Sequence, residues 1–281
     1  MRAAAIAGAL SIALGGRALA QGDCFPGPES NEAKTLAIFS VPLAFGPAGA
    51  PFTRGRISVG IEAVYLPNVD PAVATPTVCR PGKGPENTDL LFAAPRPRVA
   101  VALGGGFTLE GSWIPPIRLN QVSANLFGVA LGWTTALGDA HRLTLRGHGS
   151  FGRVRAPITC DDEALADPLS ECYQGTRSDD RYRPNIVGAD ATVSWSLGGG
   201  RVQPYLGAGY NRLMPRFQVH FTNVAGQLDE RRVEVDLDRA VLFGGATWWP
   251  AGGRLGLSGE LYAAPSDAIT GRVAVRLAVG S

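Results

Sequence analysis

Apolar and polar residues alternate at every second position along most of this chain. In residues 142–154, Leu143, Leu145 and Phe151 fall on one side of an extended strand, while Arg146 and His148 fall on the other. Successive side chains of a strand point to opposite faces, so this segment predicts a strand with one apolar and one charged face. The pattern recurs from residue 56 to the C-terminus. Such repetition is typical of an all-β, antiparallel, up-and-down barrel.

The pattern predicts about ten strands, joined alternately by short turns and by longer polar connections. The short glycine-rich turns lie at residues 104–106, 137–140, 198–200 and 251–253, and the longest connections lie at 68–97 and 156–184. Residues 202–221 form one long predicted strand. Short turns at one end and long loops at the other are typical of barrels that span a membrane.

The apolar rows of the strands are predicted to contact hydrocarbon. Leu145, Val193 and Leu257 represent these rows. In the strand within residues 231–249, the row that contains Val241 and Phe243 is likewise predicted to face outward. The complete row in that strand is Val233, Val235, Leu237, Val241 and Phe243.

Aromatic residues stand at the ends of the predicted strands. Trp133, Trp195 and Trp249 come just before short turns, and Tyr65 and Trp113 come just before longer loops. Amphipathic rings collect at the headgroup levels of a bilayer. We therefore predict that these five side chains form two aromatic girdles on the outer surface of the barrel.

With these features, residues 55–281 resemble the bacterial outer-membrane β-barrel proteins, as a general superfamily. The segment PYLGAGY at 204–210 is similar to pieces found in such proteins. The resemblance implies a porin-like fold in a Gram-negative outer membrane. It also implies contact with membrane lipid and lipopolysaccharide, and insertion by the outer-membrane assembly machinery. Such proteins usually end in an aromatic residue, and Ser281 departs from that pattern.

The first 20 residues have the organisation of an export signal. Arg2 is followed by an apolar run at 3–14 and by the small-residue sequence Ala-Leu-Ala at 18–20. This predicts a signal peptide over residues 1–20, cleaved before Gln21. A membrane anchor would need about 20 unbroken apolar residues, and Gly-Gly-Arg at 15–17 interrupts the run.

Residues 21–54 do not alternate and form a separate N-terminal segment. Ser30 has the character of a helix N-cap, and residues 33–39 continue a short helix up to a break before Pro42. A strand over residues 36–45 is the alternative. A helix here could plug the lumen or cap the periplasmic mouth, and a loosely held arm is the other interpretation.

The four cysteines that follow the predicted signal peptide indicate disulfides. An even number in an exported chain favours pairing, and no C-x-x-C sequence suggests zinc. Cys160 and Cys172 lie in one loop and are the expected pair, which leaves Cys24 with Cys79 by elimination. No metal ion or other cofactor is expected.

If the apolar rows face lipid, the charged side chains of the same strands face the lumen. This predicted set is Glu62, Arg98, Glu110, Arg142, Arg146, His148, Asp190, Glu260, Arg272 and Arg276. Nearly balanced signs favour ion pairs that fill a narrow lumen, because an unpaired buried charge is costly. A narrow polar conduit or a small-ligand cavity is the alternative. A general porin is not favoured, because barrels near eight strands are filled by side chains.

One short motif suggests chemistry. The spacing of His148 and Ser150 resembles the His-x-Ser spacing of outer-membrane lipid A deacylases. That resemblance implies a base and a nucleophile of a lipid hydrolase. The strand phase, however, points both residues into the barrel, whereas that family's triad faces lipid. The hydrolase is therefore kept as the alternative to a non-catalytic barrel.

Charge excludes one class of partner. The chain has 26 Lys and Arg and 24 Asp and Glu, a net charge of +2, so no nucleic-acid partner is expected. The acidic loop at 161–180 lacks the D-x-D-x-D-G spacing of a calcium loop and is predicted to be a solvated loop.

We predict a monomeric barrel without catalysis, which is a structural or surface-exposed protein, a narrow conduit or a small-ligand binder. An exported soluble barrel that holds a ligand is a third possibility, against which the girdles argue.

Overall fold

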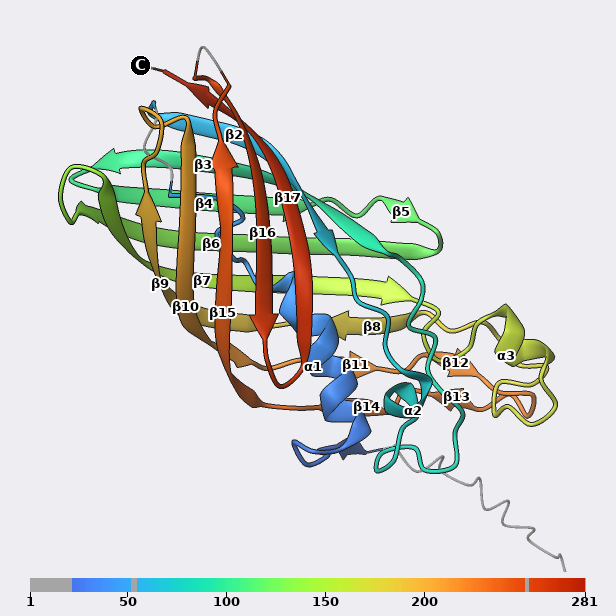
Figure 1. Ribbon diagram of the computed structural model, residues 1–281. Coiled ribbons are helices and arrows are strands. Elements are labelled where there is room, and N and C mark those ends of the chain that lie inside the picture. Colours follow the sequence, from blue (N-terminus) through green and yellow to red (C-terminus); the bar gives the residue numbers. More distant parts are fainter. Residues whose placement is uncertain (1–21, 52–54, 251–252, 281) are drawn as a thin grey trace, which may run out of the picture.

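The protein is a closed antiparallel β-barrel (Figure 1). The computed structural model describes residues 22–51, 55–250 and 253–280, and the predicted signal peptide and Ser281 lie outside these residues. Within the described residues ten long strands form the barrel wall. They are β2 (Ile57–Tyr65), β3 (Ala93–Gly104), β4 (Phe107–Ile114), β6 (Val122–Ala136), β7 (His141–Ala156), β9 (Ile186–Trp195), β10 (Val202–Leu213), β15 (Leu237–Trp248), β16 (Leu255–Ala264) and β17 (Ala268–Val279). Pairing of β17 with β2 closes the barrel and confirms the predicted fold class.

The two ends of the barrel differ. At the turn end, short turns join β3 to β4, β6 to β7 and β9 to β10. The turn predicted at 251–253, between β15 and β16, lies partly outside the described residues. Gly198, Gly199 and Gly200 in one of these turns have φ of 59°, 68° and 80°, which glycine adopts without steric cost. The opposite end, the loop end, carries the long connections.

Shorter elements lie at the loop end, and several of the strands among them extend the wall. They are β1 (Asp23–Cys24), α2 (Pro71–Ala74), β5 (Arg118–Leu119), α3 (Asp162–Ala166), β8 (Asp180–Arg183), β11 (Arg216–Gln218), β12 (Phe221–Thr222), β13 (Leu228–Asp229) and β14 (Arg232–Glu234). Strand β8 pairs with β7 and β11, β11 pairs with β14, and β14 pairs in parallel with β1. The long strand predicted over residues 202–221 is therefore broken: β10 ends at Leu213, and β11 and β12 follow.

The outer surface of the barrel is apolar, as the alternation predicts. Leu145 and Leu257 are exposed on it, and Val193 is half-buried on the same face. Tyr65, Trp113 and Trp133 are also exposed, and Trp195 is half-buried. An outward apolar band with aromatic residues near its edges is the surface of a barrel that spans a membrane. Among the described helices, none has both the length and the apolar composition to cross a membrane.

Strand β15 has the opposite phase to the predicted one. Val241 and Phe243 are buried inside the barrel, whereas Leu242 and Trp248 are exposed outside. From Ala240 onward both alternating sets of this strand lack charged residues, so the pattern there could not choose between the faces. Val233, Val235 and Leu237 are likewise buried.

The girdle prediction for Trp249 is wrong for the same reason. Trp249 follows the inward phase of β15 and is buried, and its Nε1–H donates a hydrogen bond of 3.0 Å to Gln203 Oε1. A buried indole N–H needs such an acceptor. Its neighbour Trp248 takes the outward position, with half of its surface exposed.

The long connection predicted at residues 68–97 is shorter than expected. Strand β3 begins at Ala93 and includes Pro95 and Pro97, which sequence rules favour in loops. Its ladder with β4 begins only at Arg98, so both prolines lie where β3 has an edge.

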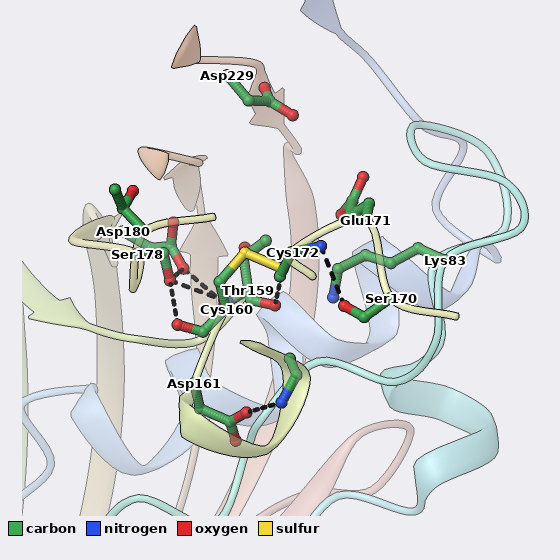
Figure 2. Close-up of a disulfide and its surroundings, with 12 residues drawn as sticks. Lys83, Thr159, Cys160, Asp161, Ser170, Glu171, Cys172, Ser178, Asp180 and Asp229 are labelled. Atoms are coloured by element: carbon green, nitrogen blue, oxygen red, sulfur yellow. Dashed lines mark hydrogen bonds between the residues drawn. A yellow bond between two sulfur atoms is a disulfide. The ribbon is translucent and has the colours of Figure 1, made fainter. Parts of the chain in front are cut away.

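Both predicted disulfides form at the loop end. Cys24 bonds to Cys79 and Cys160 bonds to Cys172, with Cα–Cα distances of 5.8 and 5.6 Å. Figure 2 shows the second disulfide among the residues that surround it. It closes the loop that contains α3, and both of its cysteines are buried.

Asp180 fastens this loop to the neighbouring strands (Figure 2). Its Oδ2 accepts hydrogen bonds from Thr159 N (2.6 Å) and Ser178 Oγ (2.7 Å), and its Oδ1 accepts one from His220 N (2.9 Å). The side chain is fully buried. Burial raises the pKa of Asp180 to about 6, although the three donors act to lower it.

We expect the loop at residues 157–179 to lose stability as pH rises. Because the folded protein binds this proton more tightly than the unfolded chain, stability is greatest below pH 3.8 and falls through about pH 6. The total change is about 3 kcal/mol. Hydrogen exchange at pH 4.5 and 7, corrected for intrinsic rates, should show weaker protection at pH 7. D180N should abolish this pH dependence, and D179N, at the partly exposed neighbour, should retain it. Equal protection of the unmodified loop at both pH values would contradict the assignment.

Candidate functional site

Helix α1 (Asn31–Leu43) lies inside the barrel and enters from the loop end (Figure 1). It begins where predicted, because Ser30 is its N-cap and accepts a hydrogen bond of 3.2 Å from Ala33 N. It does not end before Pro42, as predicted, but continues to Leu43. In the last turn the missing proline N–H costs only one intrahelical bond, and side chains of the barrel satisfy the final carbonyls, as described below.

The N-terminal end of α1 is fixed to the loop between β2 and β3. The Glu32 carboxylate accepts backbone N–H hydrogen bonds from Thr77 (3.0 Å), Val78 (2.7 Å) and Cys79 (2.7 Å). Burial acts to raise the pKa of Glu32, but these donors keep it below its usual value. The disulfide from Cys24 to Cys79 holds the same loop to the residues before the helix.

After α1 the chain continues through the lumen as residues 44–50, which we call the lumenal segment. Guanidinium groups of the barrel wall donate hydrogen bonds to its backbone carbonyls and to those of the last helical turn. The pairs are Arg272 to Val41 and Ala44, Arg96 to Leu43 and Ala44, Arg146 to Phe45, Arg98 to Gly46, and Arg276 to Pro47 and Ala50. The wall also accepts from this segment, since Ala48 N donates to Glu260 Oε2 (3.0 Å) and Ala50 N to Thr247 Oγ1 (2.8 Å). The buried backbone is thereby paired throughout much of its length.

Phe45 lies at the centre of this arrangement and is fully buried. The guanidinium carbons of Arg98, Arg146 and Arg96 lie 4.3, 5.6 and 5.9 Å from its ring centroid. These are cation–π distances. The next residue must be small, because a Cβ at Gly46 would collide with the Arg272 guanidinium.

Three of these arginines, Arg98, Arg146 and Arg272, also form ion pairs with the lumenal carboxylates. Arg98 contacts Glu62 (Nη1–Oε2, 2.6 Å) and Glu110 (Nη2–Oε2, 2.8 Å). Arg272 contacts Glu260 (Nη1–Oε1, 3.2 Å). Arg146 lies 3.5 Å from Asp190, between its Nη1 and that residue's Oδ2. Among the described residues, the network joins five arginines and four carboxylates, and backbone carbonyls supply the additional acceptors.

The structure thus brings most of the predicted lumenal set together, with one exception and one addition. Arg142 follows the inward phase of β7 but is exposed at the turn end, because the strand extends past the level of the network. Arg96 belongs to the network but was assigned to a loop because of the adjacent prolines. The alternation of Arg96, Arg98 and Ala100 on one face could have identified it.

His148 and Ser150 do not form a catalytic arrangement. Both are buried and face the lumen, away from lipid. His148 Nε2 lies 3.5 Å from Asp190 Oδ2, but His148 Nδ1 and Ser150 Oγ have no hydrogen-bond partner in the part of the chain that the structure describes. The lipid hydrolase alternative is not supported. The described residues also hold no cluster of three or more His, Cys, Asp or Glu placed for a metal ion.

The lumenal segment leaves little space beside it. Between this segment and the wall near the turn end lies a small pocket of about 40 Å³, bordered by Gly49, Ala50, Arg98, Glu110 and Arg276. That volume holds only a few water molecules.

A much larger cavity lies beside α1 at the loop end. Its volume is about 420 Å³, and its lining is almost entirely apolar. Leu36 and Phe39 of α1, Leu91 of the loop after β2, Ile114 of β4, Leu126 of β6 and Val154 of β7 contribute to it.

The charged residues at the edge of this cavity already have partners. Glu32 is bonded to backbone N–H groups, and Arg80 pairs with Glu86 (Nη1–Oε1, 2.8 Å). Tyr182 shares a hydrogen bond of 2.6 Å with Ser40. The cavity therefore presents hydrocarbon, and its polar groups are used within the protein. Sequence reasoning missed this site, because its lining comes from segments far apart in the chain.

No family model and no curated protein matches this sequence. Several solved structures are similar to this one at low TM-scores. Ail, the attachment invasion locus protein of Yersinia pestis, matches at 9% identity over 80% of this chain and 97% of its own, with a TM-score of 0.31. The toluene transporter TodX of Pseudomonas putida matches at 9% identity over 86% of this chain and 70% of its own, with a TM-score of 0.34. The translocator domain of the autotransporter NalP of Neisseria meningitidis matches at 11% identity over 88% and 95%, with a TM-score of 0.31. At these values the similarities carry no argument about function, and the barrel is defined by its own strand pairing.

Proposed function

We propose that this protein is a monomeric, non-catalytic outer-membrane barrel that binds a small apolar molecule in its loop-end cavity. The observation that carries the proposal is the apolar cavity of about 420 Å³. After export and removal of the signal peptide, the assembly machinery inserts the barrel. The turn end then faces the periplasm and the loop end faces the lipopolysaccharide surface. Two disulfides at the loop end support an oxidising location.

The cavity supports a ligand without charge. Its volume lies in the range of small-molecule sites, about 300 to 1,000 Å³. A charged group placed there would lose its water without gaining a partner, because the nearby charges are paired with each other. An aromatic or aliphatic hydrocarbon would replace empty space with van der Waals contacts. We therefore assign the ligand to uncharged hydrocarbons and their close derivatives.

A narrow conduit is the other role that the sequence allows, and the lumenal segment argues against it. Residues 44–50 cross the lumen at the level of the charged network, held by five arginines. A passing ion would have to displace buried backbone from these hydrogen bonds. The proposed barrel is therefore plugged by its own N-terminal segment.

Replacing Phe45 with alanine should destabilise this plug. The change removes a buried aromatic ring and its three cation–π contacts, so we expect a loss of about 3–5 kcal/mol in the free energy of unfolding. Urea unfolding in lipid vesicles, followed by the gel mobility of the folded barrel, measures it. F151A removes an outward ring that contacts lipid, and it should cost much less. An equal loss in both variants would show that the lumenal ring has no special role.

Planar-bilayer recordings should show no steady conductance for the unmodified protein. G46V should introduce openings, because its Cβ would collide with the Arg272 guanidinium and displace the lumenal segment. G147V is the matched control, since a Cβ at Gly147 would meet no atom within 4 Å. Steady conductance of the unmodified barrel would favour the conduit over the plug.

Partly filling the cavity should weaken ligand binding. Ala124 of β6 lines the cavity, so A124F would occupy the space that a ligand needs. Ala191 of β9 is exposed on the outer face, and A191F serves as the control. With 1-fluoronaphthalene in protein-containing nanodiscs, a separate ¹⁹F resonance should report the bound probe. We expect A124F to weaken binding about tenfold or more and A191F to leave it unchanged. Absence of a bound resonance in the unmodified protein would overturn the proposed function.

A further inference from the structure

The barrel wall has a break between β3 and β4 near the loop end. The ladder between these strands reaches only the pair Arg98–Ser112. On either side the wall continues, because β2 pairs with β3 as far as Tyr65–Ala93, and β4 pairs with β6 as far as Ile114–Leu126. Residues 93–97 of β3 and residues 113–114 of β4 therefore border a gap in the described wall.

The sequence maintains this gap. Pro95 and Pro97 have no N–H, so neither can donate to a neighbouring strand. Arg96 between them turns inward, where it is buried and donates to Leu43 O (3.1 Å) and Ala44 O (3.3 Å). Its charge is thereby kept away from the opening.

The apolar cavity extends to this gap. Ile61, Pro95 and Pro97 are exposed on the outer face of the wall, and all three also line the cavity. A cavity bordered by outward-facing residues meets the outer surface at that point.

The gap lies at the level of the membrane. The register sets Ala93, Pro95 and Pro97 beside Tyr65, Ala63 and Ile61, which are the outward residues at this end of β2. Tyr65 and Trp113, the aromatic residues of the loop-end girdle, stand at the far ends of their strands. The opening therefore faces hydrocarbon just inside the girdle.

The loop between β2 and β3 covers the cavity from the other side. Leu66, Leu90 and Leu91 of this loop line the cavity. The loop is fastened to its neighbour by hydrogen bonds from Asn87 N to Ile158 O (2.8 Å) and from Asn87 Nδ2 to Asp161 Oδ2 (2.5 Å). Together with the disulfide to Cys24, these contacts hold the cover in place.

We propose that apolar molecules exchange between the cavity and the surrounding membrane through the gap between β3 and β4. This inference rests on the proposed function and adds the route and the source of the ligand. The ligand dissolves first in the lipid phase and reaches its site laterally. It then crosses neither the covered loop end nor the plugged lumen.

Blocking the gap tests this route. In P97C, labelling of the folded protein with N-cyclohexylmaleimide would place a bulky group in the opening. V99C with the same label is the matched control, because Val99 also faces outward but lies where β3 pairs with β4. ¹⁹F saturation transfer between lipid-dissolved and bound 1-fluoronaphthalene in nanodiscs gives the exchange rate and the bound fraction from one sample.

We expect the label at position 97 to slow exchange about tenfold or more while the bound fraction stays the same. The label at position 99 should leave both unchanged. W113C carrying the label should also slow exchange, which provides a second variant if P97C does not fold. A bound resonance whose exchange rate is unaffected at both 97 and 113 would overturn the lateral route and leave the proposed function intact. No bound resonance in the unmodified protein would overturn the proposed function itself.

Discussion

Hydrogen bonds from wall arginines to backbone carbonyls hold the interior of this protein together. An extended chain inside a barrel has carbonyls that no strand partner can satisfy, and buried arginines need acceptors beyond the available carboxylates. In the lumen the wall arginines donate to these carbonyls, so both requirements are satisfied. The acceptors are the carbonyls of Leu43, Ala44, Phe45, Gly46 and Pro47. Unsatisfied carbonyls or unpaired arginines would each destabilise the protein. Bonded to each other, they fix the path of the N-terminal segment.

This constraint divides the barrel into two regions of opposite character. The C-terminal end of α1 and the lumenal segment lie among charges, so the region toward the turn end is polar and filled. The earlier turns of α1, with Leu36 and Phe39, face aliphatic side chains, so the region toward the loop end is apolar and hollow. One short N-terminal segment thus closes the lumen and forms a wall of the cavity.

Alternation predicted the strands, their number and most lumenal residues, because lipid on one side of a wall and charges on the other impose a period of two. It could not assign the phase of β15, where Val241 and Leu242 are equally apolar. It also missed Arg96, since the flanking prolines resemble a loop. The central interaction lay beyond sequence reasoning for another reason. Its acceptors are backbone carbonyls, which every residue possesses, so no residue type signals their use. The apolar cavity was hidden likewise, because it is assembled from distant segments.

Backbone N–H and C=O groups that face hydrocarbon without a hydrogen-bond partner cost free energy. The gap between β3 and β4 would therefore destabilise the barrel unless its sequence reduces the number of such groups. Successive N–H groups of a strand point to opposite sides, so prolines at alternate positions remove donors from one side only. The ladder to β2 is continuous over Pro95 and Pro97, so at these two positions the missing donors are on the side that faces the gap. What remains there are carbonyls, which tolerate incomplete pairing better than N–H groups do. The two prolines therefore lower the cost of an opening that any other residue pair would leave with unsatisfied donors.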